Sequence, residues 1–127
     1  MATDQSYSIL IKSDVDVSGD GTSNASPPLY GILWGFYIEY DGSLPAGTDL
    51  VITATLPSGL AHTLLTLTDT NTSGFYPVAF PVHDADGAAI SGQYEQWLLT
   101  GDTVQAVVDE GGAAAITDAV KIAVIIL

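Results

Sequence analysis

The sequence contains no cysteine among its 127 residues. This absence excludes disulfide bonds, thiolate metal sites and cysteine nucleophiles together. Positive charge is almost as scarce, because Lys12 and Lys121 are the only basic residues besides two histidines and face fifteen acidic residues, for a formal net charge of −13. The protein is therefore strongly acidic, and its partners are constrained by that charge.

Nucleic acid and anionic membrane surfaces are poor partners for such a chain. Proteins bind polyphosphate by neutralising phosphates with lysine and arginine, and they bind anionic lipid headgroups in the same way. We therefore expect no nucleic-acid and no membrane partner. A partner should be basic, or should meet the protein through neutral surface.

No targeting segment is expected. The first residues, MATDQSYS, lack a basic region followed by an apolar run. The apolar stretch at residues 120–127 is far shorter than the ~20 residues that span a bilayer. The pattern indicates a protein that is made and kept in soluble form until it meets its partner.

Apolar and polar residues alternate along most of the chain, and Gly, Pro, Asp and Asn interrupt the alternation at intervals typical of β-sandwiches. With 47% hydrophobic residues, the chain can bury a core. The pattern predicts an all-β, single-domain β-sandwich over residues 1–127, jelly-roll-like, with about eight strands. The strands are expected at residues 7–12, 29–40, 49–56, 60–67, 75–82, 93–99, 103–108 and 119–126.

Several details of this prediction depend on single residues. Gly35, inside the long aromatic strand, suggests a bulge or a close approach of another backbone. Pro77 and Pro81 predict an edge strand or an extended loop, because proline cannot donate to a strand ladder. Loops are expected at residues 13–28 and 83–92, and a turn or a bulged approach to the last strand at residues 112–119. The last strand is apolar on both faces, which predicts a central strand or one covered on both sides. Its C-terminus is expected to be fixed in the fold or in a subunit interface, and an ordinary core strand is the favoured interpretation.

The search for catalytic chemistry finds no recognisable set. A serine nucleophile needs a poised base and an oxyanion site, but no G-x-S-x-G, phosphate-loop or dinucleotide glycine pattern occurs. His62 lies in an alternating segment and is expected to face solvent. We therefore expect no catalytic residue, no cofactor and no enzyme activity.

Two groups of residues are candidate metal ligands. Asp14, Asp16 and Asp20 resemble a hard-cation loop, although an EF-hand loop beginning at Asp14 would need an acidic ligand where Ala25 stands. His83, Asp84 and Asp86 are too few from one loop to close a site. Turn-forming aspartates in solvated loops are the favoured interpretation of both groups. A calcium site at the first group is kept as a minor hypothesis.

Aromatic residues gather between residues 30 and 40. If no bulge intervenes, Trp34, Phe36, Ile38 and Tyr40 share one face, and Leu33, Tyr37 and Glu39 share the other. Exposed Trp and Tyr would suit sugar stacking or a protein interface. A carbohydrate-binding or host-surface-binding module, using Trp34 or Trp97, is therefore the alternative function.

Residues 63–91, TLLTLTDTNTSGFYPVAFPVHDADGAAIS, resemble a segment of small structural proteins of tailed-bacteriophage heads. In those proteins a TLLT-type strand leads to a Ser-Gly-aromatic-Tyr-Pro turn and then to a PVHD-x-x-G-A-A-I stretch. The upstream segment LYGILWGFYIEYDGSLPAGTDLVITAT resembles the strand, turn and strand that precede it. An arginine often follows the Tyr-Pro pair in that pattern, whereas Val78 follows it here.

The resemblance implies a capsid decoration or cement protein that binds and stabilises the major capsid shell. Such a protein is made in the host cytoplasm, sits on the capsid exterior of the virion, forms a homo-oligomer that is often a trimer, and bridges major capsid protein subunits. A head-fibre or tail component is a related hypothesis that differs mainly in the location and copy number of the protein in the virion. The candidate partner-contact residues are Phe75, Tyr76, His83, Asp84 and Trp97. Loops at residues 13–26 and 70–86 are expected to carry contacts, because loops at sandwich ends often carry function.

Overall fold

Ten strands and no helix make up residues 7–127, which are the residues that the computed structural model describes. The expectation about a targeting segment rests mainly on residues 1–6, which lie outside them. Among the described residues, no helix is long and apolar enough to cross a membrane. The strands are β1 (Tyr7–Val15), β2 (Gly21–Thr22), β3 (Leu29–Tyr40), β4 (Asp49–Thr55), β5 (Ala61–Leu67), β6 (Gly74–Pro77), β7 (Phe80–His83), β8 (Ala89–Glu95), β9 (Trp97–Asp109) and β10 (Ile116–Ile126).

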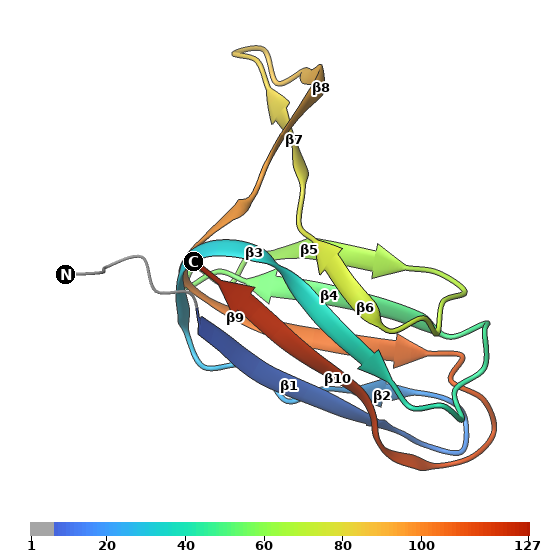
Figure 1. The fold of residues 1–127 in the computed structure, drawn as a ribbon. Coiled ribbons are helices and arrows are strands. Elements are labelled where there is room, and N and C mark those ends of the chain that lie inside the picture. The colour runs from blue at the N-terminus through green and yellow to red at the C-terminus, as the bar shows by residue number, and fades with distance from the viewer. Residues whose placement is uncertain (1–6) are drawn as a thin grey trace.

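Eight of these strands form a sandwich, and all their pairings are antiparallel. The front sheet, turned toward the viewer in Figure 1, has the order β1–β10–β3–β6. The back sheet has the order β2–β9–β4–β5. This order is that of a jelly roll, so the predicted β-sandwich fold is confirmed. The remaining two strands, β7 and β8, pair only with each other among the described strands and are inserted between β6 and β9.

The two long strands β3 and β9 belong to both sheets. Their first halves pair with each other, and their second halves separate to join the front and back sheets. Each strand has one extra residue near the point of separation: Trp34 in β3 and Gly101 in β9. Gly101 adopts φ +99°, which favours glycine. The bulge expected at Gly35 is thus confirmed, one residue earlier.

The core lies between the sheets. The inward side chains of β10 are all fully buried, and so are those of the middle of β4 and β9. Burying such aliphatic side chains stabilises the fold by ~1.5–3 kcal/mol each. The largest fully buried side chains are Phe36, Ile11, Leu33, Ile38, Leu50, Ile52, Leu99, Ile122, Ile126, Val104, Val108 and Val120.

Asp102 is a buried carboxylate next to the Gly101 bulge. Its Oδ1 accepts hydrogen bonds from the backbone N–H of Thr100 at 2.9 Å and from the Thr100 hydroxyl at 3.2 Å. Its Oδ2 accepts the indole N–H of Trp97 at 3.0 Å. These bonds compensate the cost of removing the carboxylate from water and fix the start of β9 relative to the bulge.

The bulge in β3 overturns the expected sharing of faces. Leu33 is fully buried and Trp34 is 44% exposed, whereas Phe36 and Ile38 are buried as expected. An extra residue shifts the alternation of side chains by one position. Odd-numbered residues therefore point inward before the bulge, and even-numbered residues point inward after it. Trp34 therefore lies on the outer face with Tyr37.

Several expected boundaries are also wrong. The loop expected at residues 13–28 contains the end of β1 and the short strand β2. The strand expected at residues 75–82 is split into β6 and β7, and the loop expected at residues 83–92 contains most of β8. The strand expected at residues 93–99 is divided between β8 and β9, and β9 continues through the strand expected at residues 103–108. β10 begins at Ile116, inside the expected turn.

Replacing Asp102 by alanine should destabilise the sandwich. Asp102→Ala removes three hydrogen bonds and leaves the Trp97 indole N–H without its partner, which should lower the free energy of unfolding by about 2–4 kcal/mol. Urea unfolding followed by circular dichroism measures the change. Asp86→Ala, at an exposed turn, is the control and should change it by less than about 0.5 kcal/mol. Equal, small effects of both substitutions would contradict a structural role for Asp102.

Candidate functional site

The β7–β8 hairpin, hereafter the arm, projects away from one end of the sandwich (Figure 1). Phe80 pairs with Glu95, Pro81 with Tyr94, and His83 with Ala89. The turn at its tip is closed by Asp84, whose carboxylate accepts the backbone N–H groups of Asp86 and Ala88. Asp84 is therefore a turn-forming aspartate, as favoured from the sequence.

The arm has almost no core of its own. Six of the seven residues of β8 are exposed, including Tyr94 at 65%. A lone two-stranded hairpin is marginally stable in water, because it lacks a third strand or a layer to pack against. The arm is thus the part of the described chain that gains most from packing against another surface.

Aromatic side chains hold the root of the arm to the sandwich. The ring of His62, on β5, stacks on Trp97 with centroids 4.2 Å apart and an interplanar angle of 7°. Phe80, at the start of the arm, packs against both rings at 5.0 and 5.6 Å. Asp102, next to the Gly101 bulge, also accepts the indole N–H of Trp97. The root is therefore held by contacts from the arm, from the back sheet and from the bulge.

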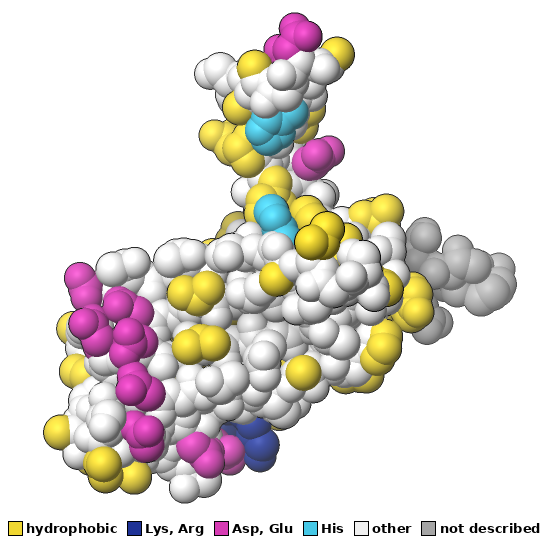
Figure 2. Space-filling model, turned by 180° about the vertical axis from the view of Figure 1, so that it is seen from behind, with side chains coloured by type: hydrophobic (Ala, Val, Ile, Leu, Met, Phe, Trp, Pro, Cys, Tyr) yellow, Lys and Arg dark blue, Asp and Glu magenta, His cyan; other side chains and the backbone are white. Residues whose placement is uncertain are grey.

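His62 does not simply face solvent, as the alternation predicted. It is half-buried, and its Nε2 is buried without a hydrogen-bond partner among residues 7–127. Beside it lies a cleft of about 450 Å³, lined by His62, Phe80, Pro81, His83, Glu95, Gln96 and Trp97. Figure 2 shows the histidines and apolar side chains gathered on the arm and around its root.

The structure distributes the candidate contact residues over three places. His83 and Trp97 line the same root cleft, and Asp84 lies at the arm tip. Phe75 and Tyr76 lie on β6 instead. Phe75 is 42% exposed on the outer face of the front sheet, and Tyr76 is half-buried against the core.

The acidic residues gather at the end of the sandwich opposite the arm (Figure 2). The jelly-roll order brings the β1–β2, β3–β4, β5–β6 and β9–β10 loops together there, and most carboxylates belong to these loops or their flanking strand ends. This acidic end comprises Asp14, Asp16, Asp20, Asp41, Asp49, Asp69, Asp109, Glu110 and Asp118. Within the contact loop expected at residues 13–26, residues 14–20 lie at this end, and residues 23–26 run along β9. The other expected loop, at residues 70–86, is wrong as a loop, because it contains β6 and β7, and its residues 80–86 lie in the arm.

Crowding raises the pKa of two of these carboxyl groups. A hydrogen bond with Asp109 is the main cause of the raised pKa of Asp20, followed by partial desolvation and the negative charges of Asp109 and Asp16. A hydrogen bond with Asp49 is the main cause of the raised pKa of Glu110, followed by the charges of Asp49 and Asp109. The folded protein therefore releases these protons at a higher pH than separate carboxyl groups would.

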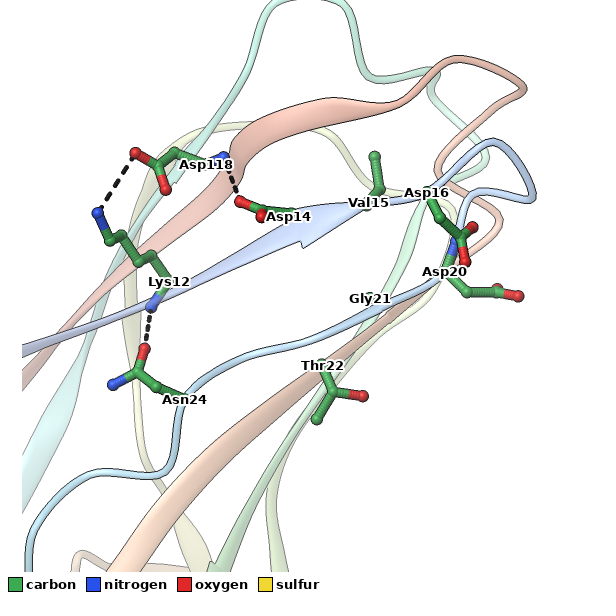
Figure 3. A pocket seen from close by; sticks show the side chains of 9 residues that line it. All are labelled: Lys12, Asp14, Val15, Asp16, Asp20, Gly21, Thr22, Asn24 and Asp118. Atoms are coloured by element: carbon green, nitrogen blue, oxygen red, sulfur yellow. Dashed lines mark hydrogen bonds and ion pairs between the residues drawn. The ribbon is translucent and has the colours of Figure 1, made fainter.

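The calcium hypothesis concerned Asp14, Asp16 and Asp20, which line a cleft of about 570 Å³ (Figure 3). Asp14 accepts the backbone N–H of Asp118, and Asp16 accepts those of Ser18 and Asp20. In Figure 3, Asp14 points toward Asp118 and away from the other two carboxylates. These oxygens serve turns and strand ends, as favoured from the sequence, and the calcium hypothesis stays a prediction.

A different group of carboxylates converges at the same end. Asp49, Asp69 and Glu110 place one oxygen each within 4.8 Å of one another. Sequence reasoning did not find this group, because its members come from three separate segments. The pairing of β4 with β9 and the hydrogen bond from the Asp69 backbone N–H to Asp49 at 2.9 Å bring them together.

Comparison with known proteins identifies no relative. No protein-family model, no curated protein and no solved structure matches the chain. The resemblance of residues 63–91 to phage head proteins therefore stays a prediction.

Lowering the pH from about 7 to about 4, through the ordinary carboxyl range, should stabilise the protein. The pKa values of Asp20 and Glu110 are raised by folding, so the folded state binds protons more readily than the unfolded chain over this range. The gain appears as the pH falls through the raised values and is complete below the ordinary carboxyl range. Differential scanning calorimetry at constant ionic strength should give a higher Tm at the lower pH.

A variant tests the origin of this pH dependence. Glu110→Gln removes one of the crowded charges, so it should raise Tm at neutral pH and reduce the difference between the two pH values. Asp86→Asn, at the exposed arm tip, should leave the difference unchanged. A Tm that falls steadily on acidification in the unsubstituted protein would contradict the electrostatic account.

Proposed function

We propose that the chain is a virion structural protein, a capsid decoration or cement protein that binds the major capsid protein on the exterior of the shell. The observation that carries the proposal is the arm. It is a two-stranded ribbon that extends beyond the sandwich without a core beneath it. Such an element has a physical reason to pack against a neighbouring protein.

The arm and the sequence resemblance fall on the same stretch of chain. Residues 63–91 run from β5 through β6 and β7 into β8, so the segment that resembles phage head proteins builds most of the arm. Its PVHD-x-x-G motif forms the second half of β7 and the tip, where Asp84 and Gly87 close the turn. The motif thus has a structural role in shaping the arm. This role supports the proposal that the motif serves the same purpose here as in the phage head proteins that the segment resembles.

The acidic end supplies a second contact of different chemistry. Its crowded carboxylates repel one another, and a basic surface would relieve that repulsion. A protein with an arm at one end and a charged surface at the other can touch two subunits at once. Bridging of this kind is what a cement protein requires, and a homo-oligomer, which the resemblance implies, would multiply the contacts.

The carbohydrate-binding alternative has less support. One face of Trp97 is stacked against His62, and its indole N–H is bonded to Asp102. That leaves no open platform on that face for a sugar ring. Trp34 remains 44% exposed, but it lies at the edge of a mainly apolar surface, whereas a sugar site needs several placed polar groups.

The cement role predicts copy number. In purified particles of the virus that encodes the chain, quantitative mass spectrometry should find it at a fixed, high ratio to the major capsid protein. Absence from the particle, or a few copies only, would refute the proposal. A few copies confined to the tail would favour the related reading as a tail component.

The arm should be required for attachment to the shell but not for the stability of the sandwich. Replacing residues 82–93 by Asn-Gly shortens the arm to the Phe80–Glu95 and Pro81–Tyr94 pairs and closes it with a favoured two-residue turn. Urea unfolding should give an unchanged free energy of unfolding, because the removed residues have no contact with the core. Binding to shells that lack the protein, measured by co-sedimentation, should be lost.

Point variants give a matched comparison for the same assay. Tyr94→Ala removes an exposed aromatic side chain from the arm and should weaken shell binding at least tenfold, as truncation of an interface aromatic often does. Leu60→Ala removes a side chain of similar exposure from the β4–β5 turn and should have no effect. Full binding by the shortened-arm protein would show that attachment occurs elsewhere.

A further inference from the structure

The outer face of the front sheet is apolar where a solvated sheet face would be polar. Leu10 on β1, Ala123 on β10, Tyr37 on β3 and Phe75 on β6 pair in register and form one row across four strands. Leu10 is 56%, Tyr37 50% and Phe75 42% exposed. Toward the arm, half-buried Ile125 and the exposed residues Trp34 and Leu127 extend this apolar surface.

The outer face of the back sheet provides an internal comparison. There Thr53 lies opposite Gln105 and Thr63, and Thr55 lies opposite Thr103. Exposed Val107 and half-buried Val51, which pair with each other, form a small apolar spot on this face. Figure 2 shows this side of the molecule with scattered rather than continuous apolar side chains. An antiparallel sheet with one solvated face normally has this polar pattern, so the front face differs from it.

The front face also carries the chain's two lysines. Lys12, Lys121 and Glu39 form the next row, in register on β1, β10 and β3. Lys12 lies 3.4 Å from Asp118, and Lys121 lies 3.8 Å from Glu39. This row is close to neutral, whereas the protein has a net charge of −13. The front face is where a second acidic molecule can approach with little charge repulsion.

We propose that the front face binds a second copy of this chain, with a two-fold axis parallel to β10. Since β10 lies between β1 and β3, the two-fold axis exchanges the positions of those strands. Lys12 of each copy then faces Glu39 of the other, and Leu10 faces Tyr37. The small Ala123 side chains meet at the axis, where the sheets approach most closely.

The packing geometry is an ordinary one. Two sheets pack face to face at about 10 Å separation, with mean strand directions within about 30° of each other, and the parallel β10 strands of this arrangement fall inside that range. Lys121 lies on the axis, and its own Glu39 offsets the repulsion between the two copies. The proposal concerns the front sheet and is independent of the function proposed for the arm.

The size of the face sets the strength of the contact. Three strands of about seven residues and the four-residue β6, at about 4.8 Å spacing and about 3.3 Å rise, cover roughly 400 Å² in projection on each copy. With side-chain relief, the two copies bury an area near the lower limit of specific interfaces, about 1,000 Å². We therefore expect a reversible dimer with a Kd on the order of micromolar.

Sedimentation velocity of the full chain from about 1 to about 100 μM tests the proposal across this affinity range. The unsubstituted protein should shift from the mass of one chain to the mass of two. Leu10→Lys and Tyr37→Lys should each remain monomeric at all concentrations. Val107→Lys is the matched control on the back sheet, with a similar exposed fraction, and should dimerise normally.

Charge exchange tests the two-fold arrangement. Lys12→Glu and Glu39→Lys should each weaken dimerisation roughly tenfold, because each change acts twice in a symmetric dimer. The double variant should recover it. Both changes also disturb the ion pairs within one chain, with Asp118 and Lys121. The double variant does not repair those pairs, so recovery reports the contact between copies.

Three results would overturn the proposal. One is a monomer at every concentration. If Tyr37→Lys also abolishes shell binding in that case, the front face binds another protein and not a second copy. The second is a dimer that tolerates both lysine substitutions on the front face. The third is a trimer in place of the dimer, which requires a three-fold arrangement. Attachment through the arm can succeed or fail in each case, so the two proposals are tested separately.

Discussion

Two strands that belong to both sheets are the constraint on which the rest of the structure depends. β3 and β9 begin paired with each other and then separate, each after one extra residue. Gly101 supplies the left-handed backbone that this requires in β9, and buried Asp102 fixes the bulge by bonding Thr100 and Trp97. Since Trp97 also supports the root of the arm, one buried carboxylate connects the crossing of the sheets to the position of the hairpin that projects from them.

The jelly-roll order then divides the surface into regions of different chemistry. Four loops meet at one end and concentrate the carboxylates there, while the long β6–β9 connection at the other end forms the arm. The front sheet presents apolar rows and both lysines, and the back sheet presents mainly threonine and glutamine. Each region therefore offers a different type of contact, although the chain has few charged residue types.

Much of the sandwich was predictable from the sequence, because alternation follows directly from a strand with one buried face. The bounds of β4 and β5 were predicted within one residue for this reason. The arm was not, since β8 has no buried face and therefore no alternation to detect. The orientation of Trp34 was wrong because one bulged residue reverses the alternation. The convergence of Asp49, Asp69 and Glu110 depends on strand pairing between distant segments, which no local pattern contains.

The segregation of carboxylates has a consequence for motion before contact. A body with most of its negative charge at one end carries a large electric dipole moment, and a positively charged surface exerts a torque on it at separations of about a Debye length, ~8–10 Å. The molecule would rotate so that its loop end leads, and it would arrive already aligned. Only a small further rotation by diffusion would then be needed before the first side chains touch.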